Sequence, residues 1–129
     1  MLNDYKSFAE YIALNYPLAV KIVEVGIGNE FSVYKELKRL LVNVDIIAVD
    51  IKGNYPFKDD ITKSKSDIYE GSDLIYSIRP NPELYIPLIN MASKVQTDLI
   101  IRPFSLDYPP ENGRLINYKK AVFFLFKNQ

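Results

Sequence analysis

The run from Lys21 to Gly28, KIVEVGIG, constrains the fold more than any other part of the chain. Its apolar residues predict a buried strand, its two glycines predict a tight turn, and the pattern that follows predicts a helix. Open α/β sheets build a nucleotide-sized binding site from such a unit. Gly26 allows the sharp turn, and Gly28 lets a ligand approach the backbone because no Cβ stands in the way. The run therefore predicts both an α/β fold and the place of a ligand site.

A second predicted strand, Val44–Val49, ends in Asp50. Its distance from the glycines is close to the roughly 20 residues at which such folds place a carboxylate that binds ribose hydroxyls. The alternative for the two glycines is a purely structural turn between a strand and a helix. Because Asp50 follows at the expected distance, ligand binding is the favoured interpretation.

Strands alternate with helices along most of the chain. Helices are predicted near residues 3–15, 31–41 and 81–95, and strands near 21–25, 44–49, 73–78, 98–101, 114–118 and 121–126. This alternation implies a mostly parallel sheet with right-handed crossovers, which place the first strand between the second and third, and the last two strands form an antiparallel pair. We therefore expect one three-layer Rossmann-like domain over residues 1–129.

Composition limits the chemistry and the partners. The chain has no Cys and no His, so thiolates, disulfides and imidazole metal ligands are excluded, and we predict no metal site. Lys plus Arg equals Asp plus Glu at 16 each, so no global field favours nucleic acid or an anionic membrane. A signal-peptide pattern and an apolar run of the roughly 20 residues that span a bilayer are both missing, so a cytoplasmic protein is the default expectation.

Two predicted parallel strands end alike, in SIRP and IIRP. Their arginines, Arg79 and Arg102, are expected on the same sheet edge as the glycine turn, with both guanidinium groups over one cleft. There they would suit a carboxylate or a phosphate. The alternative is an internal ion pair with Glu24, Glu30 or Asp50, which would neutralise an acidic edge. The sequence favours neither.

The run VEVGIG, together with Asp50, resembles the class I S-adenosylmethionine-dependent methyltransferases. The resemblance implies that Glu24, Gly26 and Gly28 line the methionine side of S-adenosylmethionine and that Asp50 holds its ribose. Asp60 looks like the acidic residue that these enzymes place near the adenine amino group, although acidic residues are common in loops. The terminal strand pair is similar to the last strands of their sheet.

Three departures from that pattern matter. Glu30 stands at the third glycine position and puts a carboxylate at the helix start, which disfavours the pyrophosphate of NAD more than S-adenosylmethionine. Only nine residues separate Asp50 from Asp60, so the usual second helix and third strand are expected to be shortened or absent. The strand-end motif for amino methylation is not met by Asn81–Leu84, and no substrate-recognition segment is evident.

As a whole chain, the sequence resembles a small archaeal group, the uncharacterised protein family numbered 0146. The matching segments are EVGIG at 24–28, YSIRP at 76–80, Glu83–Leu84 and the aromatic run 118–124. No activity is assigned to that family, so this resemblance supplies none.

The predicted function is therefore binding of S-adenosylmethionine or a related adenosine ligand, with methyl transfer as one outcome and no catalytic residue assigned. Methyl transfer needs mainly proximity and orientation, so the lack of His is no obstacle. The alternative is a non-catalytic nucleotide-sensing or protein-interaction module. A dinucleotide-binding regulatory domain is the third candidate, which the carboxylate of Glu30 disfavours.

Overall fold

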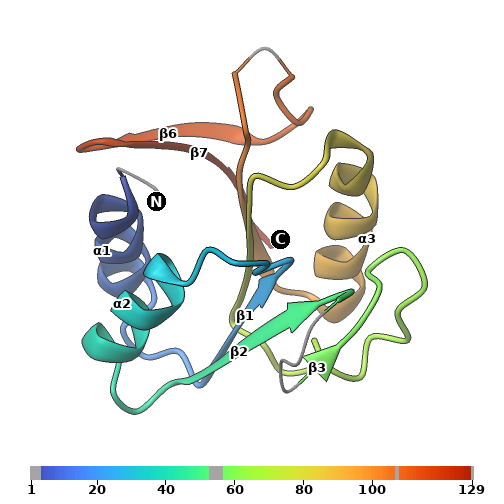
Figure 1. Ribbon diagram of the computed structural model, residues 1–129, viewed down its shortest axis with the longest axis horizontal. Helices are drawn as coiled ribbons and strands as arrows, with labels where there is room; N and C mark the ends of the chain where they lie inside the picture. The colour runs from blue at the N-terminus through green and yellow to red at the C-terminus, as the bar shows by residue number, and fades with distance from the viewer. Residues whose placement is uncertain (1–3, 53–56, 107, 129) are drawn as a thin grey trace.

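The structure of the protein is a computed structural model that describes residues 4–52, 57–106 and 108–128 (Figure 1). Its elements are α1 (Tyr5–Asn15), β1 (Lys21–Val25), α2 (Ser32–Leu40), β2 (Asp45–Asp50), β3 (Phe57–Lys58), β4 (Leu74–Ile78), the 3₁₀ turn η1 (Pro82–Leu84), α3 (Tyr85–Val95), β5 (Asp98–Arg102), β6 (Arg114–Tyr118) and β7 (Ala121–Phe126). The predicted alternation of strands and helices is confirmed.

The strands form one sheet in the order β3-β2-β1-β4-β5-β7-β6. All neighbours from β3 to β5 are parallel, whereas β7 runs antiparallel to both β5 and β6. The expected position of β1 between β2 and β4 is confirmed. Its Glu24 lies opposite Ala48 on one side and Tyr76 on the other.

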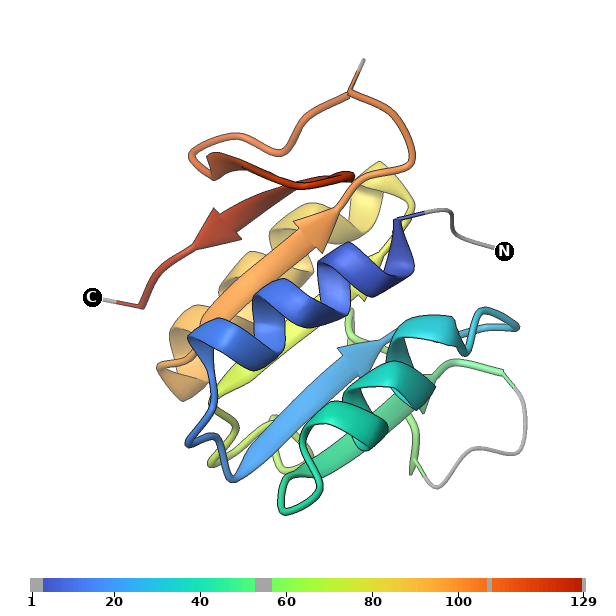
Figure 2. The same ribbon diagram turned by 90° about the vertical axis from the view of Figure 1, so that its left-hand side faces the viewer.

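Helices cover both faces of the sheet, which gives three layers. The helices α1 and α2 lie together on one face and α3 lies on the other (Figures 1 and 2). Phe8 and Tyr11 of α1 meet the ring of Phe123 in β7 edge-on, with centroid separations of 5.0 and 4.8 Å. These aromatic contacts fix α1 over the part of the sheet that includes β5 and β7.

The helix that follows β4 begins in two steps. The side chain of Asn81 accepts a hydrogen bond from the N–H of Glu83 (3.4 Å), and the first turn, with Pro82 at its start, is 3₁₀. The regular helix α3 begins at Tyr85, and Pro87 occupies its first turn, where an N–H is not needed. The predicted helix near residues 81–95 is therefore present, but its regular part begins only at Tyr85.

The connection from β2 to β4 is short, as expected. The strand β3 has two residues, and the described part of the connection, residues 51–52 and 57–73, contains no helix. Instead, Ile61 and Tyr69 are buried in the apolar cluster on the α3 side of the sheet. The hydroxyl of Tyr69 donates to Asp59 (2.7 Å), so loop side chains cover the sheet where a helix would otherwise lie.

Candidate functional site: the carboxyl edge of the sheet

The glycine turn after β1 folds back onto β2. The N–H groups of Gly26 and Ile27 both donate to the carbonyl of Val49, at 2.7 and 3.3 Å. Gly26 and Gly28 have φ of +76° and +55°, in the left-handed region that side chains disfavour. A Cβ at Gly26 would have no atom within 4 Å, so the backbone is open to a ligand at this residue.

Asp50, at the end of β2, contacts this turn directly. Its Oδ2 accepts a hydrogen bond from the N–H of Gly28 (2.6 Å), and its Oδ1 accepts one from the N–H of Lys52 (3.2 Å). An ionised carboxylate offers about four lone-pair positions, so both oxygens can still accept hydrogen bonds from hydroxyl groups. The structure thus brings together Gly26, Gly28 and Asp50 as the sequence predicted.

Asp60 lies at the same edge, after β3. The preceding residue, Asp59, donates its N–H to the carbonyl of Asp50 (3.0 Å), which ties the two segments together. One oxygen of Asp60 accepts hydrogen bonds from the Oγ1 and the N–H of Thr62, at 2.6 and 3.0 Å. These bonds hold the pKa of Asp60 below its usual value, and the carboxylate organises its own loop.

Glu24 is placed differently. Only 1% of it is exposed, and its Oε1 accepts a hydrogen bond of 2.6 Å from the hydroxyl of Tyr76. It lies on the sheet face covered by α1 and α2, because its strand neighbour Ile22 belongs to that apolar cluster. Burial, with a smaller contribution from the charge of Glu30, raises the pKa of Glu24 to about 8. The raised pKa favours the neutral form of this carboxyl group at pH 7, and burial closes it off from solvent.

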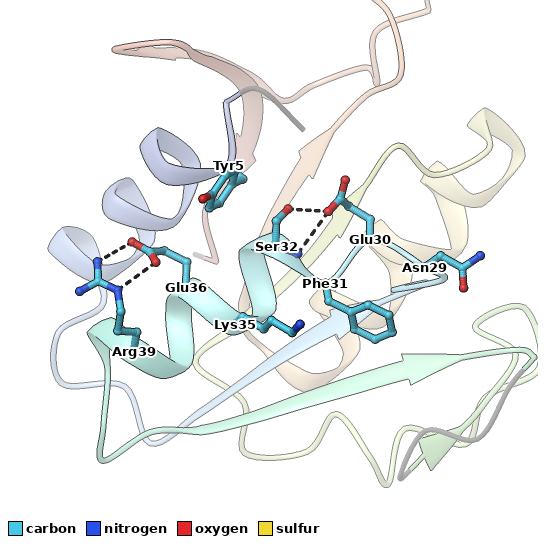
Figure 3. Close-up of a pocket in the computed structure, with 8 residues that line it drawn as sticks. All are labelled: Tyr5, Asn29, Glu30, Phe31, Ser32, Lys35, Glu36 and Arg39. Atoms are coloured by element: carbon cyan, nitrogen blue, oxygen red, sulfur yellow. Dashed lines mark hydrogen bonds and ion pairs between the residues drawn. The ribbon is translucent and has the colours of Figure 1, made fainter. Parts of the chain in front are cut away.

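A pocket of about 570 Å³ borders the turn on the side of α2 (Figure 3). Its lining comprises Tyr5, Asn29, Glu30, Phe31, Ser32, Lys35, Glu36 and Arg39, and includes neither Gly28 nor Asp50. In this pocket Glu30 accepts hydrogen bonds from the Oγ and N–H of Ser32, at 2.5 and 3.2 Å. A carboxylate at the start of α2 is favourable for the helix, and Glu30 places a negative charge beside the glycine turn, whereas Glu36 further along the pocket is paired with Arg39.

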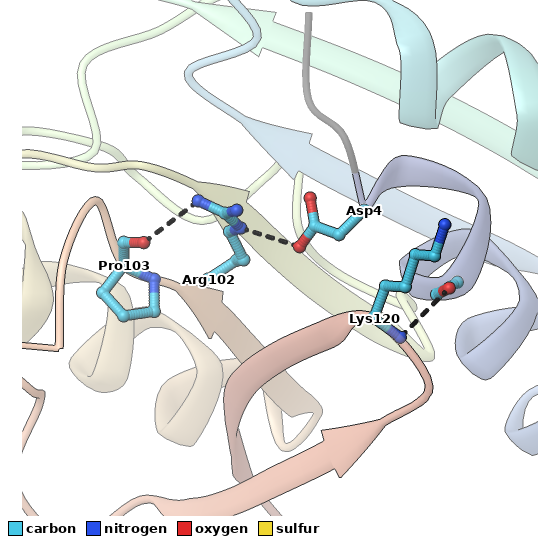
Figure 4. A network of polar contacts seen from close by, with 5 residues as sticks. Asp4, Arg102, Pro103 and Lys120 are labelled. Carbon is cyan, nitrogen blue, oxygen red and sulfur yellow. Dashed lines mark hydrogen bonds and ion pairs between the residues drawn. The ribbon is translucent and has the colours of Figure 1, made fainter.

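Arg102 pairs with a residue that the sequence did not suggest. Its Nε lies 3.1 Å from Oδ2 of Asp4, and its Nη1 donates to the carbonyl of Pro103 at 3.3 Å (Figure 4). The other oxygen of Asp4 is buried and has no hydrogen-bond partner. The N–H of Lys120 donates to the Oγ of Ser7 (3.4 Å), a second tie from α1 to the sheet. The predicted carboxylate partners of Arg102 were wrong, because α1 brings its own carboxylate over β5.

Arg79 is exposed and points elsewhere. Its guanidinium carbon lies 5.9 Å from the centroid of the Phe104 ring, and no carboxylate in the described part of the chain pairs with it. Its φ is +54°, and its N–H donates to the carbonyl of Arg102 (2.7 Å). The expectation of one cleft shared by both guanidinium groups was wrong. Arg102 follows the strand face that α1 covers, whereas the left-handed backbone turns Arg79 toward the loop after β5.

Two features are absent from the described residues. These residues contain no group of three or more carboxylates that could hold a metal ion. None of their helices combines the length and the hydrophobicity that crossing a bilayer requires.

The comparison with protein families gives a clear match. The family described as uncharacterised protein family UPF0146 matches residues 5–128. The chain belongs to this family. The UPF0146 protein of Archaeoglobus fulgidus is 39% identical over 127 residues, which cover 94% of this chain and 93% of that protein. The UPF0146 protein of Pyrococcus furiosus is 39% identical over 130 residues, which cover 95% of this chain and 98% of that protein. The resemblance seen in the sequence is confirmed.

Solved structures share the fold of this UPF0146 chain at low sequence identity. A candidate S-adenosyl-L-methionine-dependent methyltransferase from Methanococcus maripaludis has a TM-score of 0.66 and 11% identity, and the match covers 97% of this chain and 85% of that one. The N-terminal domain of EvdMO1, with SAH (S-adenosylhomocysteine) bound, has a TM-score of 0.61 and 12% identity. The match covers 100% of this chain and 68% of that one. The plantazolicin methyltransferase BpumL, in complex with SAH, has a TM-score of 0.55 and 16% identity. The match covers 76% of this chain and 44% of BpumL, which is less than half its length. These likenesses show a methyltransferase-type Rossmann-like fold.

The buried carboxyl of Glu24 predicts how stability depends on pH. Between its ordinary pKa of 4.5 and its folded pKa of about 8, the folded chain holds a proton that the unfolded chain releases. Stability should therefore fall as pH rises from 5 to 8, by up to about 1.4 kcal/mol per pH unit. Glu24→Gln keeps a neutral acceptor for Tyr76 and should flatten this slope. Urea unfolding at pH 5, 6.5 and 8 measures it, with the exposed Glu111→Gln as the control. Equal slopes for wild type and Glu24→Gln would contradict the assignment.

The two arginines should differ in their effect on stability. Arg102→Ala leaves the carboxylate of Asp4 buried without a cation, and should lower the free energy of unfolding by about 2–4 kcal/mol. Arg79→Ala removes an exposed side chain and should change it by about 0.5 kcal/mol or less. Urea denaturation followed by circular dichroism compares them. A loss of the same size for both variants would show that Arg102 has no special structural role.

Proposed function

We propose that this chain binds S-adenosylmethionine or a closely related adenosine compound at the glycine turn of β1. The observation that carries the proposal is the contact between Gly28 and Asp50, at 2.6 Å. It joins a backbone that a ligand can approach closely to a carboxylate that can accept hydrogen bonds from two ribose hydroxyls. The SAH bound by the structural neighbours is in keeping with such a ligand.

The charge around the turn supports a ligand with a cationic centre. Glu30 and Asp50 both place carboxylates at this edge, where Asp50 accepts a hydrogen bond from Gly28 and Glu30 accepts one from Ser32. Two carboxylates beside a glycine turn disfavour a pyrophosphate and favour a sulfonium or an ammonium group. This preference separates S-adenosylmethionine from dinucleotides. Asp60 would lie on the adenine side, and Gly26 on the methionine side.

Methyl transfer is the reaction that this proposal allows. The chain would supply binding and orientation, because an S-adenosylmethionine sulfonium is already reactive and needs chiefly an acceptor held in line. A base is needed only where the acceptor must lose a proton. We assign no catalytic residue.

A non-catalytic nucleotide-sensing or protein-interaction module is the second candidate, and one observation favours it. Glu24, which the family resemblance places on the methionine side, is hydrogen-bonded to Tyr76 and buried. A chain with this carboxyl closed off would bind the adenosine half of the ligand more firmly than the methionine half. Comparing the affinities for SAH and for adenosine separates the two candidates, since near-equal values favour the sensing module.

Asp50→Ala tests the binding site. Loss of charged hydrogen bonds to ribose should weaken binding of SAH by about 1.5–3 kcal/mol, measured by isothermal titration calorimetry. Asp45→Ala removes an exposed carboxylate at the opposite end of β2 and should leave the affinity unchanged. Circular dichroism confirms that both variants are folded. SAH affinity that is the same for wild type and Asp50→Ala would refute the role of Asp50.

A further inference from the structure

A groove separate from the glycine turn runs from the end of β4 along the start of α3. It consists of two adjoining hollows of about 680 and 630 Å³, whose walls share Pro82, Tyr85 and Tyr108. Each hollow is within the usual range of about 300–1,000 Å³ for small-ligand pockets. The strands β1 and β4 are parallel neighbours, so their carboxyl ends meet at one edge of the sheet. The groove and the glycine turn therefore lie on the same edge.

The walls of the groove present aromatic rings to solvent. Phe104 is 75% exposed and Tyr108 is 70% exposed. Tyr85, at the start of α3, is 9% exposed, and its hydroxyl donates to the carbonyl of Tyr108 (2.8 Å), which ties this loop to α3. Exposed rings on a tethered loop offer flat apolar surfaces on which a planar ring can stack.

Arg79 places a positive charge at one end of the groove. Its guanidinium lies over the ring of Phe104, 5.9 Å from the centroid, and takes no carboxylate partner from the described residues. The hydrogen bond from its N–H to the carbonyl of Arg102 holds a left-handed backbone that few residues other than glycine adopt. The guanidinium group beside the ring of Phe104 is a fork for a carboxylate or a phosphate.

The rest of the charge distribution limits the occupant to one anionic group. Glu111 lines the second hollow, so a second anion at that end would be repelled. The whole chain carries 16 basic and 16 acidic residues, which gives no field to attract a polyanion such as RNA.

We propose that this groove binds a small molecule with one planar aromatic ring and one carboxylate or phosphate. The ring stacks on Phe104 and Tyr108, and the anionic group pairs with Arg79. The identification of this molecule as a methyl acceptor rests on the proposed function, because it requires S-adenosylmethionine at the neighbouring turn. The binding itself does not.

Calorimetric titration tests the groove with two aromatic anions, UMP and 4-hydroxybenzoate, in the presence and absence of SAH. Uridine and benzyl alcohol are the uncharged counterparts. We expect saturable binding of at least one anion, and affinity lower by about tenfold or more for its uncharged counterpart, the loss typical of a charged hydrogen bond. Arg79→Gln and Phe104→Ala should each lower the affinity for that anion by a similar factor. Lys94→Gln removes an exposed positive charge from the last turn of α3 and should leave anion affinity unchanged, and SAH affinity should be unchanged in all three folded variants.

The outcomes separate this inference from the proposed function. If SAH binds through Asp50 but neither anion binds the wild type, the groove is wrong and the adenosine site stands. If an anion binds through Arg79 while SAH does not bind, the groove is right and the adenosine site is wrong. If neither Arg79→Gln nor Phe104→Ala weakens binding of the anion, the proposed groove site is refuted. The proposed groove site is also refuted if hexauridylate binds far more tightly than UMP, because a surface for a polymer would then be the better description.

Discussion

The two parallel pairings of β1 determine where every residue of the candidate site lies. Pairing with β2 puts the carbonyl of Val49 under the glycine turn and brings Asp50 to the N–H of Gly28. Pairing with β4 sets Glu24 opposite Tyr76, beneath α1 and α2. A shift of one residue in the register of β1 would turn its side chains to the opposite faces. The same strand therefore presents an open backbone at its end and a closed carboxyl two residues earlier.

Much of this arrangement follows from local sequence and general rules of chain geometry. Apolar strands that alternate with helices imply a parallel sheet, and right-handed crossovers place β1 between β2 and β4. The contact between Gly28 and Asp50 follows from that order, since Asp50 ends β2 and Gly28 lies in the turn that follows the neighbouring parallel strand β1. The short connection between β2 and β4 is likewise visible in the spacing of Asp50 and Asp60.

The pairs that were not predicted join residues far apart in the chain. Asp4 and Arg102 are separated by 98 positions, and Glu24 and Tyr76 by 52. Which carboxylate an arginine reaches depends on how α1 packs on the sheet, and that packing rests on aromatic contacts such as Phe8 with Phe123. The alternation of side chains along β1 and β4 could have indicated the pair with Tyr76. No local pattern indicates the left-handed backbone that separates Arg79 from Arg102.

The central claim is that the turn after β1 and the end of β2 form an adenosine site. An NMR titration of the ¹⁵N-labelled protein with SAH tests it most directly. We expect saturable shifts that are largest for the backbone amides of residues 26–29 and 50–52, with smaller changes near Asp60. The absence of shifts at saturating SAH, or shifts confined to residues away from this edge of the sheet, would contradict it.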